Sequence, residues 1–173
     1  MEKKKRIIIF IAICIAALFV IALSASVFGV SASNIEQDAR KSQRINSSWA
    51  VSKATNDRLG AMIFYNETLD AYVYSIYVSR EGFSFGYFFR HSGSGGIMDG
   101  IHEFTYDTNG SALISMNKSK VAGITLDDGI HVTGIDIDPT KPFAAVIPVN
   151  CGYVTLYDVN GNVVPITAIY LNA

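Results

Sequence analysis

The chain has 173 residues, of which 50% are hydrophobic and 17% are charged, and its formal net charge is -1. This length is typical of one folded domain, and the hydrophobic fraction excludes an intrinsically disordered chain. The near-neutral charge argues against a nucleic-acid-binding function, which would require a basic face, and two cysteines are too few for a disulfide framework.

The N-terminus has the layout of an export signal. A basic cluster from Lys3 to Arg6 precedes residues 7–32, which carry no charge, and the run 7–23 is almost entirely aliphatic or aromatic. An apolar run of this kind partitions into the bilayer, while the lysines resist crossing it. We therefore expect residues 1–32 to be a signal peptide or a membrane anchor.

Two fates of this segment are open. Small residues up to Ala32 form a cleavage site, and cleavage there would release a secreted protein that begins at Ser33. Residues 7–23 could instead stay in the membrane as an uncleaved anchor, because their length lies between that of a signal peptide and a full span of about 20 residues. In both cases we expect residues 33–173 to be extracytoplasmic, as in bacterial export.

Residues 33–48 are polar and carry charges of both signs. We expect a solvated linker between the membrane and the domain, because its apolar content is too low to pack. The alternative is a short helix capped by Asn34 and Gln37. Residues 49–173 are then the folded domain.

From Trp49 onward, short runs rich in β-branched and aromatic residues alternate with turn residues. Turns such as 127–129 and 158–161 supply the Asp, Asn and Gly residues that tight hairpins require. The pattern predicts an all-β domain, an antiparallel β-sandwich of about ten short strands, with a β-barrel as the alternative. The expected strands are 48–54, 59–66, 71–79, 83–90, 101–106, 111–116, 120–126, 130–137, 143–149, 152–158 and 163–171.

Aromatic residues are concentrated in the expected strands 71–79 and 83–90. Alternation along the first of these places Tyr72 and Tyr74 on one face and Tyr77 on the other. A tyrosine-rich face can line a binding surface for sugars or peptides, because the ring is amphipathic. Tyr72, Tyr74 and Tyr77 are therefore candidate binding residues.

A packing role for the aromatic residues is the alternative that we favour, since aromatic side chains dominate the energetics of burial. Phe83, Phe85 and Phe89 share one face of their expected strand. We expect these three side chains in the core, with Tyr72 or Tyr77 at its margin.

The segment 91–96 is rich in Gly and Ser, and we expect it to be a mobile connection at one end of the sandwich. Loops of this kind often carry binding contacts. His91, Ser92 and Ser94 therefore join the candidate binding residues. The expected ligand is a cell-envelope polymer or a protein.

Cys151 is the one cysteine that follows the N-terminal segment, and a cysteine beside a histidine can form a thiolate nucleophile. The layout of a basic anchor, an all-β domain and a late cysteine after a strand resembles that of the sortases. The resemblance implies a cysteine-dependent transpeptidase or peptidase in which Cys151 acts with a histidine such as His131. The chain departs from that family because its last arginine is Arg90, whereas sortases need an arginine shortly after the cysteine.

His102 and His131 follow identical Asp-Gly-Ile sequences and would meet if their strands paired, which makes them a candidate metal pair. No third ligand pattern accompanies them, and we expect no cofactor. The function that we predict is an extracytoplasmic, non-catalytic binding or envelope-associated module, secreted or anchored by residues 7–23, with the cysteine enzyme as the alternative.

Overall fold

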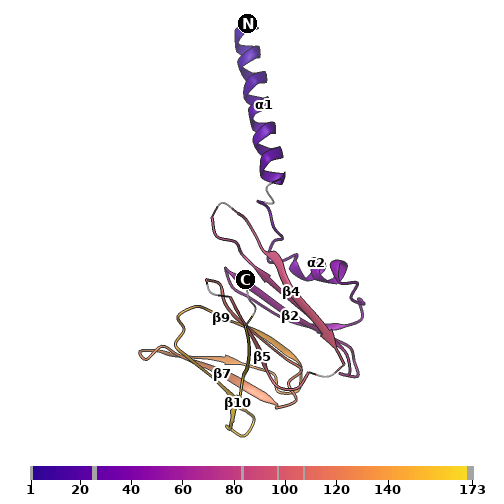
Figure 1. Ribbon diagram of the computed structural model, residues 1–173, viewed down its shortest axis with the longest axis vertical. Coiled ribbons are helices and arrows are strands. Elements are labelled where there is room, and N and C mark those ends of the chain that lie inside the picture. The colour runs from indigo at the N-terminus through magenta and orange to yellow at the C-terminus, as the bar shows by residue number, and fades with distance from the viewer. Residues whose placement is uncertain (1, 25–26, 83, 97, 107, 171–173) are drawn as a thin grey trace.

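The computed structural model describes residues 2–24, 27–82, 84–96, 98–106 and 108–170. This part of the chain contains two helices and twelve strands. The strands form three four-stranded sheets, none of which closes into a barrel (Figure 1). The prediction of a mostly β fold is therefore confirmed, and the barrel alternative is wrong.

The N-terminal residues form α1, Glu2–Ser24, which extends away from the β body (Figure 1). Its side chains from Lys3 to Val20 are exposed. Among the described residues, no helix combines the length and the apolar character that crossing a membrane requires.

The first sheet is an antiparallel meander in the order β1-β2-β3-β4. Alternation along its strands divides the side chains between two faces. In β2, for example, Leu59 and Ile63 face one cluster of buried residues, whereas Met62 and Phe64 face another. The strands are β1, Ala50–Thr55; β2, Leu59–Tyr65; β3, Tyr72–Val78; and β4, Phe88–Gly95.

The central sheet has the order β12-β5-β6-β9, and the third sheet has the order β11-β10-β7-β8. All neighbours in these sheets are antiparallel except β12 and β5, which are parallel. The strands of the central sheet are β5, His102–Tyr106; β6, Gly110–Ser115; β9, Phe143–Ile147; and β12, Thr167–Tyr170. Those of the third sheet are β7, Val121–Asp127; β8, Val132–Asp136; β10, Tyr153–Asp158; and β11, Val163–Val164.

The central sheet is buried on both faces, and β6 shows this most clearly. Ala112 and Ile114 pack against the first sheet, whereas Leu113, between them in sequence, packs against the third sheet. Every residue of β6 is buried as a result. A strand with two buried faces has consecutive apolar residues rather than alternating ones, as in the run Ala112-Leu113-Ile114 of β6.

Residues 33–48 contain α2, Ile35–Ser42, which packs on the outer face of the first sheet. Ile35 and Ala39 are fully buried there, so the expectation of a solvated linker is wrong and the short-helix alternative holds. Asn34 occupies the N-cap position, but its side chain makes no capping hydrogen bond. The helix is stabilised by packing, because Ile35 and Ala39 lie one turn apart on the same face.

Two expected strands differ from the observed ones. The strand expected at 83–90 begins at Phe88 and continues to Gly95, so the segment 91–95 is part of β4 and not a mobile loop. β4 pairs with β3 from Phe88 to Gly95, with one bulge at Arg90. The strand expected at 163–171 is divided into β11 and β12, because Pro165 lies between them and cannot donate to a ladder.

The phenylalanines expected in the core lie elsewhere. Phe85 and Phe89 are 54% and 50% exposed, and Phe83 lies outside the described residues. Phe85 precedes β4, and Phe89 pairs with Tyr77 on the face of the first sheet that carries α2, not on the face toward the central sheet. Tyr74 and Phe104 are the buried aromatic residues between the first and central sheets, and Tyr65, Tyr72 and Tyr106 pack against this cluster partly buried.

Candidate functional site

Tyr72 and Tyr74 lie on the face of β3 that packs toward the central sheet. Tyr74 is 9% exposed, and its ring centroid is 5.0 Å from that of Phe104. Its hydroxyl lies 3.0 Å from Nε2 of His91. Because burial lowers the pKa of His91, the neutral imidazole is favoured, and its Nε2 can accept a hydrogen bond from the hydroxyl of Tyr74. The structure thus brings Tyr72, Tyr74 and His91 together in one aromatic cluster.

Tyr77, Ser92 and Ser94 belong to the opposite face of the first sheet. Tyr77 is fully buried, and its hydroxyl donates to Oδ2 of Asp38 in α2 at 2.6 Å. Ser92 and Ser94 pair across the ladder with Ser75 and Val73. The six candidate binding residues are therefore divided between two faces of one sheet, and their binding role stays a prediction.

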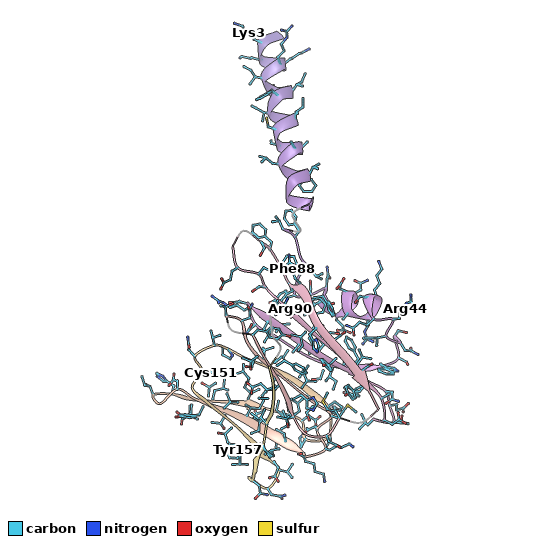
Figure 2. All side chains as sticks on the ribbon, viewed as in Figure 1. Lys3, Arg44, Phe88, Arg90, Cys151 and Tyr157 are labelled. Atoms are coloured by element: carbon cyan, nitrogen blue, oxygen red, sulfur yellow. The ribbon has the colours of Figure 1, made fainter. Side chains whose placement is uncertain are left out.

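Cys151 lies in the loop between β9 and β10, at the margin of the β body (Figure 2), and its partly buried side chain packs against the cluster between the central and third sheets. His131 lies in the turn before β8, and its side chain is 79% exposed beside Asp128. Among the described residues, no histidine is hydrogen-bonded to Cys151. The cysteine enzyme stays a prediction that Cys151→Ser tests, because the loss of the nucleophile abolishes a thiol enzyme and leaves a binding module intact.

His102 and His131 belong to different sheets. His102 begins β5 in the central sheet, and His131 directly precedes β8 in the third sheet. β5 and β8 are not neighbours, so the strand pairing that would bring the two imidazoles together does not occur. The described part of the chain contains no group of three His, Cys, Asp or Glu side chains that could hold a metal ion.

A feature that the sequence did not reveal is a backbone junction between residues 27–30, which follow α1, and residues 85–87, which precede β4. The amide of Gly29 donates to the carbonyl of Phe85 at 2.7 Å, and the amide of Phe85 donates to the carbonyl of Val27 at 2.8 Å. Val30 and Tyr87 exchange two further backbone hydrogen bonds, each of 2.8 Å. Residues 27–30 are thus hydrogen-bonded into the β body.

Side chains and glycines of the junction reinforce these hydrogen bonds. The rings of Phe28 and Phe85 stack with centroids 5.9 Å apart and an interplanar angle of 18°. Gly29 lies directly against the carbonyl of Tyr87. Gly86 has a φ of +85°, and a β-carbon on it would lie only 2.8 Å from the carbonyl oxygen of Val30, which is too close. The two backbone segments can approach closely because each has a glycine, Gly29 or Gly86, at the point of contact.

A weak signal of this junction is present in the sequence. Phe28-Gly29-Val30 and Phe85-Gly86-Tyr87 share a pattern of phenylalanine, glycine and a second apolar residue. Their separation along the chain hides the relationship, since neither triplet is long enough to predict a strand.

No protein-family model, curated protein or solved structure matches the chain. Its function therefore has to be argued from its own residues.

Proposed function

We propose that the chain is a membrane-tethered, extracytoplasmic binding module in which a β-sandwich body is held at the membrane by an N-terminal anchor that is not removed. The observation that carries this proposal is the junction between residues 27–30 and 85–87. The ligand is a cell-envelope polymer or protein, and the binding is non-catalytic.

Export and anchoring are supported by the charge pattern of the N-terminus. Lys3 to Arg6 precede an uncharged run, residues 7–32, which continues beyond the described side chains of α1. Cationic residues at the start of an apolar segment favour an orientation in which they remain in the cytoplasm. The exposed side chains of α1 include Ile8, Phe10 and Leu18 at 65%, 68% and 66%. Soluble monomers rarely leave apolar patches of this extent uncovered, and a bilayer would cover this one.

Retention of the anchor is supported by what cleavage after Ala32 would remove. The cut would separate Val27 to Val30 from the body and with them the backbone hydrogen bonds to Phe85 and Tyr87. It would also remove the Phe28 ring from Phe85 and the Val30 side chain from the cluster that contains α2 residues. A segment that is integrated in this way belongs to the folded domain, so the anchored form is favoured over the secreted one.

A binding role is supported by the arrangement of the body relative to α1. Phe88 lies at the end of the body nearest α1, and Tyr157, in the third sheet, lies at the opposite end (Figure 2). The outer face of the third sheet exposes Tyr153, Val132 and Val163 at 82%, 68% and 66%. A tethered body of stacked sheets would present this face and its loops away from the membrane, toward envelope material.

The tether is tested by producing the complete chain in a bacterium and separating the membrane and soluble fractions. We expect the protein in the membrane fraction, resistant to extraction at alkaline pH, and we expect protease added outside the cytoplasmic membrane to digest residues 33–173. A variant with Leu18→Arg and Phe19→Arg should lose the membrane association, because charges at the centre of an apolar helix oppose insertion. Recovery of the parent protein from the cytosol in a protease-protected form would refute the proposal.

The binding role is tested separately by sedimentation of the detergent-solubilised protein with purified cell-wall material. Cosedimentation is expected to fall when Tyr153→Ser and Val132→Ser are combined. Lys41→Ala should leave it unchanged, because Lys41 is an exposed residue of α2, on the first sheet. If the protein is correctly localised but never cosediments, the proposed tether stands and the proposed envelope ligand is refuted.

A further inference from the structure

A cleft of about 630 Å³ opens between loops of the first, central and third sheets. Leu69 comes from the turn between β2 and β3, Met116 follows β6, and Val159 lies between β10 and β11. The volume is within the range of small-molecule sites, about 300–1,000 Å³. Asn117, Lys118, Lys120 and Thr140 also line the cleft.

Asn117 lines the cleft, is 5% exposed and fixes the backbone around it. Its Nδ2 donates to the carbonyls of Val121 and Asp138 at 3.2 and 3.1 Å, and its Oδ1 accepts from the amide of Val121 at 2.7 Å. One side chain therefore connects the start of β7 to the loop between β8 and β9. The cleft is preformed, which lowers the cost of ordering it around a ligand.

Leu69 gives the cleft an apolar rim, although its backbone is in a strained conformation. Its φ is +55°, a left-handed conformation that favours glycine, and its side chain is 40% exposed. The turn is closed by Oδ1 of Asn66, which accepts from the amides of Asp70 and Ala71 at 3.1 Å each. Glycine would fit this backbone conformation better than leucine. The turn itself therefore does not require the leucine side chain, which lines the cleft.

The polar part of the rim is cationic. Two of the five lysines after residue 32, Lys118 and Lys120, line the cleft, although this part of the chain has more acidic than basic residues. Lys118 lies 3.5 Å from a carboxylate oxygen of Asp99. Among the described residues, no carboxylate lies within ion-pair distance of Lys120. The carboxylate of Asp138, near the same loop, accepts a hydrogen bond from the hydroxyl of Thr140 and forms an ion pair with Lys141.

From these observations we propose that the cleft binds a small amphipathic anion. Its apolar part lies against Leu69, Met116 and Val159, and its anionic group pairs with Lys120. This site does not depend on the tether or on the envelope ligand proposed above.

Lysine footprinting of the full chain in lipid nanodiscs tests the proposal. The protein is labelled with an amine-reactive acetylating reagent in the presence of octanoate, octan-1-ol or acetate, and the modification of each lysine is read by mass spectrometry. We expect octanoate to lower the labelling rate of Lys120 at least threefold and to leave Lys41 and Lys53 unchanged. Octan-1-ol, which lacks the charge, and acetate, which lacks the chain, should each leave Lys120 unchanged.

Leu69→Gly is the matched variant, because it removes the apolar rim and also removes the backbone strain of a leucine in the left-handed conformation. This variant should fold at least as stably as the parent and should lose the protection of Lys120 by octanoate. The proposal is overturned if octanoate has no effect, or if it protects Lys41 and Lys53 as strongly as Lys120. It is also overturned if acetate or octan-1-ol protects Lys120 as strongly as octanoate does, or if octanoate still fully protects Lys120 in Leu69→Gly.

Discussion

The ring of Tyr74 lies directly against the backbone of Gly93 on the neighbouring strand, so that a β-carbon on Gly93 would lie 2.6 Å from Cε1 of the ring. Tyr72 and Gly95 repeat this relationship two residues further along, where a β-carbon on Gly95 would lie 2.9 Å from the tyrosine hydroxyl. In both pairs the tyrosine covers a glycine that could not otherwise contribute packing to the sheet. The glycines of β4 are thus required by the tyrosines of β3.

Gly93→Ala is expected to destabilise the domain by about 2 kcal/mol, the usual cost of forcing an extra methyl group into a packed site. The displaced group would be the ring of Tyr74, which is fixed between Phe104 and His91. The change is measured by urea unfolding followed through the fluorescence of the single tryptophan, Trp49. Gly134→Ala in β8 is the control, since nothing lies within 4 Å of its β-carbon position. Equal effects of the two substitutions would contradict the packing account of β4.

Tyr77→Phe is expected to cost about 2 kcal/mol, because it removes a hydrogen bond to a carboxylate and leaves Asp38 without this partner. A double-mutant cycle with Asp38→Ala should show that the two losses are not additive. Tyr153→Phe, at a position 82% exposed, should change the unfolding free energy very little. Additive losses at Tyr77 and Asp38 would show that the hydrogen bond does not hold α2 on the sheet.

Tyr106 is expected to make stability fall at alkaline pH. Burial raises the pKa of Tyr106 to about 12, so the folded state retains a proton that the unfolded chain loses near pH 10. The folded state therefore loses stability as the pH rises from about 10 toward 12. Burial also raises the pKa values of Tyr74, Tyr77 and Tyr87, which act in the same direction.

Tyr106→Phe isolates the contribution of this residue. The hydroxyl of Tyr106 is buried and has no hydrogen-bond partner among the described residues. Its removal should raise the unfolding free energy at pH 7 by about 1 kcal/mol, because an unsatisfied buried group is eliminated. The decline in stability above pH 10 should also become shallower. Urea unfolding between pH 7 and pH 11.5 measures both effects, and an unchanged alkaline slope would exclude Tyr106 as its source.

Gly86→Ala is expected to open the junction between residues 27–30 and 85–87. Chymotryptic cleavage after Phe28 should become about tenfold faster, which corresponds to about 1.4 kcal/mol of local opening energy. Gly82→Ala is a close control, because Gly82 has the same φ of +85° but nothing within 4 Å of its β-carbon position. The new N-terminus at Gly29 is detected by mass spectrometry. Equal acceleration in both variants would mean that backbone strain, and not the approach to Val30, determines the effect.

Most strands could be predicted because local signals and tertiary pairing agree. The expected strand 71–79 corresponds to β3, and the expected turns near Gly129 and Gly161 have left-handed glycines at those positions. Pattern and turn chemistry are both local properties of the sequence, so they are visible without the structure.

The remaining features depend on contacts between distant residues. β4 contains His91–Gly95, whose composition indicates a loop, but the segment pairs with β3, and the rings of Tyr72 and Tyr74 cover its glycines. α2 buries Ile35 and Ala39, and two apolar residues in eight are too few to predict packing. The cleft beside Lys120 combines loops from three sheets, so no local pattern could have predicted it.

The central claim, that the anchor stays attached to the β body, is tested most directly by the intact mass of the mature protein purified from the membrane fraction. The account predicts one species with the mass of a chain that retains Val27 to Val30 and the residues before them. A mature protein that begins at Ser33, still folded and still in the envelope, would contradict it, because the junction would then be dispensable and residues 1–32 only a removable signal.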